Sequence, residues 1–241
     1  VYWGPSYGPY HNYTEVTLKL HSLEEHFPSY VDLFSIGQSQ QGRELWTVRI
    51  TNESIQSDKI EYYLVAAHHA REAITVENAL YFIDKLIYEA TNGNATIKEL
   101  LDTTEIYVIP LFNPDGHSIL DWYPLQRKNL RISDDDGDGT LIDETEVRYV
   151  WNEQTNRSEI IYEDSADPDQ DIGEDAPGGV DLNRNYDFKW YGTGSSSDKL
   201  SEVYRGPYPA SEPEVQALQQ FIAEHDFRYA LSLHSGIFAV I

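Results

Sequence analysis

The stretch Tyr62-Tyr63-Leu64-Val65-Ala66-Ala67-His68-His69-Ala70-Arg71-Glu72 decides the fold, because an apolar strand, a polar turn and the start of a helix follow one another within it. Its first six residues do not alternate between apolar and polar, which is typical of a central strand buried on both faces of a sheet. A helix is predicted from about Ala73 to Glu89, with four apolar residues on one side: Val76, Leu80, Ile83 and Ile87. This stretch therefore predicts a strand–helix unit of an α/β protein.

The rest of the chain repeats this pattern. A first helix is predicted from Thr14, its N-cap, to Phe27, and a third begins after Ser211, where Ser211 and Glu214 form a predicted capping box. Apolar strand-like runs occupy five segments: Val31–Ile36, Leu45–Ile50, Ile60–Ala67, Ile106–Phe112 and Tyr229–Leu233. Strands that alternate with helices predict a single α/β domain over residues 1–241, with a sheet covered on both faces.

The composition excludes several classes of function. The 241 residues carry 41 Asp and Glu against 17 Lys and Arg, a formal net charge of −24. Since a field of this sign repels phosphate groups, we expect no nucleic-acid binding and no binding to an anionic membrane. No apolar run is long enough for membrane insertion. The absence of cysteine excludes disulfides and thiolate metal sites.

The negative charge is concentrated in one part of the chain. Residues 134–187 contain 18 acidic and 3 basic residues, and the segment 132–179 shows no long periodicity and no repeats. We interpret this segment as an acidic, calcium-binding-like insertion within the domain, because divalent cations are the usual reason to concentrate carboxylates. The candidate calcium ligands recur at i, i+2 and i+4 in two sets, Asp134, Asp136 and Asp138 with Asp143, and Asp167, Asp169 and Asp171 with Asp175. The alternative is a solvated acidic loop.

A candidate metal site lies where two strands end. The central strand runs into His69-Ala70-Arg71-Glu72, and His234 closes the last predicted strand. Parallel strands that end side by side bring their following residues together at the carboxyl edge of the sheet. Two histidines and one glutamate leave one position open, which is the pattern of a catalytic zinc site. The alternative is that His69 caps the strand and Glu72 opens the helix electrostatically, and His68 is a poorer ligand because it points away from its neighbour on the strand.

Six short motifs together resemble the M14 metallocarboxypeptidases, the zinc carboxypeptidase family. They occur in family order: Gly42-Arg43-Glu44, His69-Ala70-Arg71-Glu72, Asn113-Pro114-Asp115-Gly116, Gln126-Arg127-Lys128-Asn129, Asp181-Leu182-Asn183-Arg184-Asn185 and Ser232-Leu233-His234-Ser235. The resemblance covers nearly the whole chain. It implies a mixed central β-sheet flanked by helices, one catalytic zinc ion, and hydrolysis of the C-terminal peptide bond of peptides.

The resemblance also implies roles for particular residues. His69, Glu72 and His234 match the zinc ligands. Asn183 and Arg184 match the pair that grips the free C-terminal carboxylate of the substrate, since a guanidinium suits bidentate carboxylate recognition; the alternative for Arg184 is a surface ion pair.

Two further arginines match positions with assigned roles. Arg127 matches the arginine that polarises the scissile carbonyl and stabilises the oxyanion; Lys128 and Arg131 are close alternatives, and so is a basic loop that faces solvent. Arg71 matches an auxiliary substrate-binding arginine; the alternative is a charged neighbour that orients Glu72.

The chain departs from the family pattern at its end. Ile241 lies seven residues after His234, and the family's general-base glutamate lies on a strand further downstream. We therefore expect missing C-terminal elements, an uncovered sheet edge, and a polypeptide that binds zinc but does not turn over alone. A separate C-terminal fragment that completes the fold is one way to supply the base. Because the chain starts at Val1 rather than Met, we expect a processed or trimmed product.

The leading hypothesis is a secreted zinc carboxypeptidase. One alternative is an aspartoacylase-like or desuccinylase-like zinc amidohydrolase, which shares a site of two histidines and one glutamate. Another is a non-catalytic pseudoenzyme that serves as a binding module.

Overall fold

A mixed five-stranded sheet forms the centre of the molecule. The computed structural model describes residues 10–121, 123–131, 147–152, 157–162, 178–199 and 201–236. The strands lie in the order β1 (Val31–Gln38), β2 (Glu44–Ile50), β4 (Thr104–Ile109), β3 (Ile60–Ala66) and β7 (Phe227–Leu233). β1, β2 and β4 pair antiparallel, whereas β4, β3 and β7 pair parallel. The predicted mixed sheet is confirmed.

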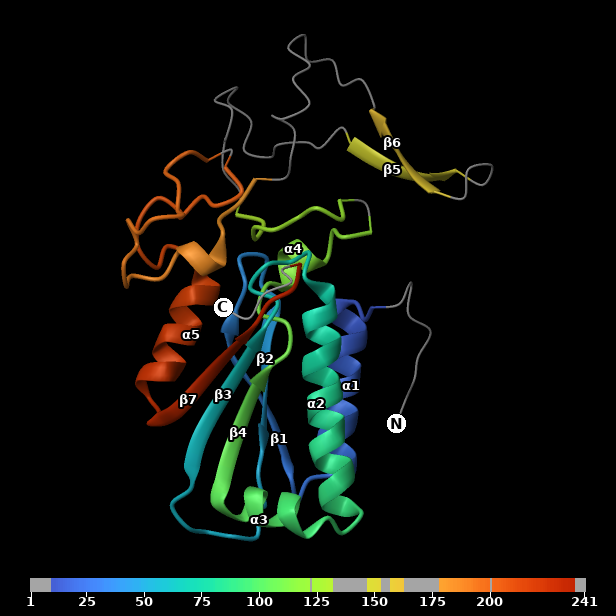
Figure 1. Cartoon of the computed structure of the whole chain (residues 1–241), viewed down its shortest axis with the longest axis vertical. Helices are drawn as coiled ribbons and strands as arrows, with labels where there is room; N and C mark the ends of the chain where they lie inside the picture. The colour runs from blue at the N-terminus through green and yellow to red at the C-terminus, as the bar shows by residue number, and fades with distance from the viewer. Residues whose placement is uncertain are drawn as a thin grey trace.

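Helices cover both faces of this sheet (Figure 1). They are α1 (Tyr13–His26), α2 (Ala73–Thr91), α3 (Ala95–Thr103), α4 (Pro114–His117), α5 (Pro213–Ala223) and the 3-10 helix η1 (Leu182–Arg184). α1 and α2 lie together on one face and α5 lies on the other, each over its own apolar cluster. Neighbouring strand residues contribute to opposite clusters, since Leu64 packs toward α2 and Val65 toward α5. The predicted α/β layering is therefore confirmed, whereas α3 was not predicted.

Two predicted helix starts are wrong in detail. The N-cap of α1 is Asn12 rather than Thr14, because Asn12 and Glu15 bond to each other's backbone N–H groups in a capping box. Ser211 and Glu214 form no such box at α5. Ser211 donates instead to Glu212, and Glu214 accepts from the backbone of Gln40. At α5, Glu214 has a long-range partner in place of the predicted capping contact.

The central strand β3 is less buried than its sequence predicts. Of the six residues predicted to be buried, Leu64, Val65, Ala66 and Ala67 are buried, whereas Tyr62 and Tyr63 are partly exposed. The neighbouring strand β7 lies at the edge of the sheet as described, with Tyr229 68% and Leu231 54% exposed. Among the described residues no strand pairs with the outer edge of β7.

The acidic segment 132–179 contains regular structure that its sequence did not reveal. β5 (Val147–Asn152) and β6 (Arg157–Tyr162) pair antiparallel as a sheet of their own. The candidate calcium ligands lie outside the described residues: Asp134, Asp136, Asp138, Asp143, Asp167, Asp169 and Asp171. In the described part of the chain, no helix has the length and apolar character needed to cross a membrane.

Candidate metal and substrate site

The turn after β3 is held in a conformation that aims its side chains over the sheet edge. Ala67 adopts a positive φ of 54°, which a residue with a side chain rarely does. Its N–H donates to the Thr75 hydroxyl at 3.1 Å, and that hydroxyl donates to the carbonyl of Glu72 at 2.7 Å. These bonds offset the strain of the turn and hold it against the first turn of α2.

His69, Glu72 and His234 come together as the sequence predicts. β3 and β7 run parallel with Ala66 opposite Leu233, so the residues that follow both strands meet at one edge. The Glu72 carboxylate lies between two imidazoles, with Oε1 2.8 Å from Nδ1 of His69 and Oε2 3.0 Å from Nδ1 of His234. Glu72 occupies the N-cap position of α2, yet its side chain makes no capping bond. The carboxylate therefore bonds to the two histidines and does not cap the helix.

The electrostatics of this cluster favour a cation. Burial works to raise the pKa of Glu72, but hydrogen bonds from His234 and His69 outweigh it and lower that pKa to about 2. One ligand atom from each of the three residues lies within 4.8 Å of the others, and this is the one such group found among the described residues. Without a metal, each Nδ1 atom needs a proton to form a hydrogen bond with the Glu72 carboxylate. A divalent ion bound by the three residues would replace these protons. Two imidazole nitrogens and one carboxylate suit zinc and leave a fourth position open.

Asp181 connects the metal cluster to Arg127. Its Oδ2 accepts from Nε and Nη2 of Arg127 at 3.0 and 2.9 Å, and its Oδ1 lies 3.4 Å from Nε2 of His69. Burial acts to raise the pKa of Asp181, but the contacts with His69 and Arg127 lower it overall. Burial acts to lower the pKa of His69, but Asp181 and Glu72 raise it overall. Sequence reasoning assigned Asp181 no role, although it begins one of the quoted motifs.

The segment that carries Arg127 is fixed by its backbone. The carbonyl of Arg127 accepts from the backbone N–H of Ala70 at 3.1 Å and from the Asn113 side chain at 3.4 Å. The alternatives considered from the sequence have other partners, since Lys128 donates to the carbonyl of Lys199 and Arg131 pairs with Glu212. Of the three basic side chains, Arg127 is the one that shares Asp181 with His69.

Asn183 and Arg184 lie in η1, immediately after Asp181. The backbone N–H of Asn183 donates to Asp181 Oδ1 at 3.0 Å, which caps this short helix. Arg184 donates from Nε to the carbonyl of Gly194 at 2.9 Å and from Nη1 to the carbonyl of Asn183 at 3.1 Å. Asp181 therefore ties the candidate carboxylate clamp, Arg127 and the metal cluster to one side chain.

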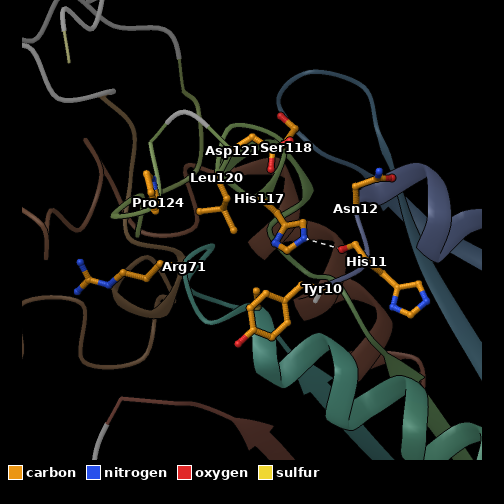
Figure 2. Close-up of a pocket in the computed structure, with 10 residues that line it drawn as sticks. Tyr10, His11, Asn12, Arg71, His117, Ser118, Leu120, Asp121 and Pro124 are labelled. Carbon is orange, nitrogen blue, oxygen red and sulfur yellow. Dashed lines mark hydrogen bonds between the residues drawn. The ribbon is translucent and has the colours of Figure 1, made fainter. Parts of the chain in front are cut away.

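Arg71 has a partner that its sequence did not reveal. Nη1 and Nη2 of Arg71 contact the two carboxylate oxygens of Glu202 at 2.7 and 3.1 Å, so its guanidinium is paired with Glu202 rather than Glu72. Arg71 also lines a cavity of about 250 Å³ together with Tyr10 and His117. Figure 2 shows the Arg71 guanidinium at the edge of this cavity, away from those two rings.

His68 is not a member of the group of candidate metal ligands found among the described residues. Its side chain is buried, at 3% exposure, and packs against Phe112 with ring centroids 4.8 Å apart. Burial, followed by the neighbouring His234 and His69, lowers the pKa of His68 to about 3. The ring is therefore neutral at physiological pH.

Known proteins resemble this chain along most of its length. The family model described as zinc carboxypeptidase, of the M14 peptidases, matches residues 17–240. Mouse carboxypeptidase A6 is 28% identical over 232 residues, which cover 95% of this chain and 44% of the relative. Crayfish (Astacus astacus) carboxypeptidase B is 24% identical and covers 94% of this chain and 61% of the relative. The chain thus spans about half the length of the curated relatives it matches.

Solved structures give the same result. The carboxypeptidase A of Helicoverpa armigera has a TM-score of 0.70 at 28% identity, and the match covers 94% of this chain and 46% of that protein. Thrombin-activatable fibrinolysis inhibitor also has a TM-score of 0.70, at 26% identity, with 94% and 47% coverage. A family model that matches almost every residue, together with a shared fold, assigns the family. The chain belongs to the M14 family of zinc carboxypeptidases.

Proposed function

We propose that this chain forms the zinc-binding part of a carboxypeptidase that hydrolyses the C-terminal peptide bond of peptides. The observation that carries the proposal is the position of Asp181, whose carboxylate contacts both Arg127 and the metal-cluster residue His69. The related proteins are carboxypeptidases of the A and B types. They favour this function over the amidohydrolase and pseudoenzyme alternatives.

In this proposal His69, Glu72 and His234 hold the zinc ion. The chemistry supplied by a zinc ion in such a site is Lewis acidity toward a carbonyl oxygen and a water molecule. Glu72 is ionised before zinc binds, because hydrogen bonds from the two imidazoles outweigh the effect of burial and lower its pKa to about 2. The chain's own residues therefore present a carboxylate between two imidazoles to the metal.

Arg127 is proposed to stabilise the negative charge that develops on the carbonyl oxygen. Asp181 contacts its Nε and Nη2, and among the described residues no hydrogen-bond partner contacts Nη1. One edge of the guanidinium is therefore fixed, and the other can donate to a substrate oxygen. A donor held before the reaction costs no reorganisation when the charge forms.

Asn183 and Arg184 are proposed to bind the free carboxylate of the substrate. Backbone carbonyls accept from Nε and Nη1 of Arg184, and its Nη2 has no partner among the described residues. Arg71 is proposed to contact the part of the peptide upstream of the scissile bond. That contact requires the peptide to displace Glu202 from the Arg71 guanidinium.

The general base is proposed to come from polypeptide beyond Ile241, either in the same chain or in a separate fragment. The carboxylates described near the site already have strong partners: Glu72 with two imidazoles, Asp181 with Arg127, Glu202 with Arg71, and Asp115 with Arg43 and Ser39. A carboxylate held by a cation is a weak proton acceptor, because the cation stabilises its ionised form.

Calcium binding in the acidic insertion and secretion of the protein are also proposed.

A peptide and its C-terminal amide test the function. The zinc-loaded chain is expected to bind an N-acylated dipeptide with a free carboxylate at least tenfold more tightly than the same dipeptide amide, measured by calorimetry. In the variant Arg184→Ala this preference is expected to fall below about threefold, since it removes a charge-assisted contact. A longer form of the protein that includes the base is expected to release the C-terminal residue, detected by mass spectrometry. Equal affinity for acid and amide, or hydrolysis of N-acetylaspartate but not of the dipeptide, would contradict the proposal.

A further inference from the structure

A chain of four hydrogen-bonding groups leads from the protein interior to the metal cluster. The Tyr186 hydroxyl lies 2.8 Å from Nε2 of His68, and Nδ1 of His68 lies 3.1 Å from Oγ of Ser232. The same Ser232 oxygen lies 3.2 Å from Nε2 of His234, whose Nδ1 faces Glu72. This series of hydrogen bonds joins three parts of the protein that are distant in sequence: the turn after β3, strand β7 and the residues after η1.

The hydroxyl of Ser232 couples the two histidines. A serine hydroxyl carries one hydrogen, so it can donate to only one of the two imidazole nitrogens that it contacts. The other nitrogen must then donate to the oxygen. It follows that, where the Ser232 hydroxyl donates to one of the two rings, only one of the two nitrogens (Nδ1 of His68 and Nε2 of His234) carries a hydrogen.

This coupling allows the series of hydrogen bonds two arrangements, which differ in which partner donates in each bond. In the first, His234 carries its hydrogen on Nε2 and leaves Nδ1 bare toward Glu72. Ser232 then donates to His68, and His68 donates from Nε2 to the Tyr186 oxygen. In the second, Tyr186 donates to His68, His68 to Ser232, and Ser232 to Nε2 of His234. The hydrogen of His234 then sits on Nδ1, facing Glu72 at 3.0 Å.

Only the first arrangement is compatible with metal binding, because a ligating imidazole nitrogen must be bare. The switch between arrangements exchanges tautomers and changes the charge of neither ring. Metal-ligating histidines usually have a hydrogen-bond partner on the nitrogen that does not bind the metal. Ser232, backed by His68, is that partner for Nε2 of His234. No described carboxylate contacts Nε2 of His234, whereas Asp181 lies 3.4 Å from the corresponding atom of His69.

We propose that Ser232 and His68 are positioning residues that set the tautomer and ring orientation of His234 for zinc. The inference rests on the zinc site proposed above. It assigns to His68, a buried side chain that makes no metal contact, a part in metal affinity. It also predicts that zinc binding at Nδ1 of His234 changes the tautomer of His68.

Zinc affinity in three variants tests the positioning role. The dissociation constant is measured by competition with a chelator at pH 7.5. Ser232→Ala removes the partner of Nε2 and is expected to weaken zinc binding about 10- to 100-fold. His68→Phe keeps an aromatic ring beside Phe112 and is expected to weaken it several-fold. Ser232→Thr is the matched control, because it keeps the hydroxyl on an exposed strand, and it is expected to stay within about threefold of the parent.

The histidine tautomers provide a readout that a merely structural role would not move. In ¹⁵N-histidine spectra, saturation with zinc is expected to move the hydrogen of His68 from Nδ1 to Nε2. His117 serves as the control, since its two ring nitrogens face the carbonyls of Ala70 and His11 and no hydroxyl couples it to a ligand. Melting of the zinc-free variants checks that each is folded.

The outcomes separate the two proposals. No zinc binding by the parent chain overturns the zinc site and this inference together. Zinc binding by the parent with unchanged affinity in Ser232→Ala overturns the inference alone. Weaker binding in Ser232→Ala without a zinc-dependent tautomer change at His68 also overturns it, because Ser232 would then act without His68.

Discussion

Replacing Glu214 with glutamine tests whether ionisation of this buried carboxyl group lowers the stability of the folded protein. The Glu212 and Glu214 side chains are fully buried, and both accept from Nδ2 of Asn129, at 2.8 and 3.3 Å. Arg131 contacts Glu212 at 2.9 Å, and no cation among the described residues contacts Glu214. Burial, together with the nearby Glu212 and Asp115, raises the pKa of Glu214 from 4.5 to about 7.

The sign of the effect follows from proton linkage. Between pH 4.5 and 7 the folded protein keeps a proton on Glu214 that the unfolded chain has lost, so stability falls as the pH rises through this range. A difference of about 2.5 between the two pKa values corresponds to about 3 kcal/mol at pH 8. Glutamine avoids this cost but loses the weak 3.3 Å contact with Asn129, worth about 1 kcal/mol. The variant Glu214→Gln is therefore expected to be about 2 kcal/mol more stable than the parent at pH 8.

Thermal and urea unfolding at pH 5 and pH 8 measure the effect. A gain of about 2 kcal/mol corresponds to a rise of roughly 4–8 °C in the melting temperature of a domain of this size. At pH 5 the gain is expected to vanish. The control Glu212→Gln breaks the pair with Arg131 and is expected to destabilise by about 2 kcal/mol or more at both pH values. A variant Glu214→Gln that is no more stable than the parent at pH 8, or equally stabilised at both pH values, would refute the reasoning.

Three further predictions concern the site and its frame. Arg127→Ala is expected to lower kcat about 10²- to 10³-fold in a catalytically active form of the protein. The zinc dissociation constant is expected to stay within about threefold. A large loss of zinc affinity would count against a role of Arg127 on the carbonyl oxygen. Gly179→Ala is expected to cost about 2 kcal/mol or more in unfolding experiments, because Gly179 has a φ of +108° and an added Cβ would overlap the Asn129 carbonyl. Its control Gly194→Ala, with a φ of +89° but open space around it, is expected to cost about 1 kcal/mol. Removing calcium with a chelator that leaves zinc bound is expected to lower the melting temperature, and an unchanged value would contradict calcium binding by the acidic insertion.

The metal cluster could be predicted from sequence because its members depend on strand ends. His69 follows an apolar run that had to be an internal strand, and His234 follows another. Parallel pairing of β3 and β7 then places both at one edge. Glu72 is the N-cap residue of the helix that begins at Ala73. These are consequences of hydrophobic pattern and local spacing, which a sequence displays directly.

The contacts that organise the site could not be predicted in the same way. Asp181 is 54 positions from Arg127 and reaches it only because the fold brings the two segments together. The pairing of Arg71 with Glu202 spans 131 positions. The predicted capping box at Ser211 failed for a related reason, since Gln40 and Asn129, both distant in sequence, donate to Glu214 instead. A polar side chain takes the partner that the fold brings to it, and that partner is not visible in local sequence.

By itself the sequence determined the α/β layering, the strands that end at the site and the identity of the three candidate zinc ligands, because burial of apolar faces follows local periodicity. Only the tertiary structure decided which basic residue stands beside His69, which acid pairs with Arg71, and that His68 reaches His234 through Ser232. Hydrogen bonds and ion pairs act over about 3 Å and depend on direction. They are therefore set by the packed positions of segments far apart in the chain.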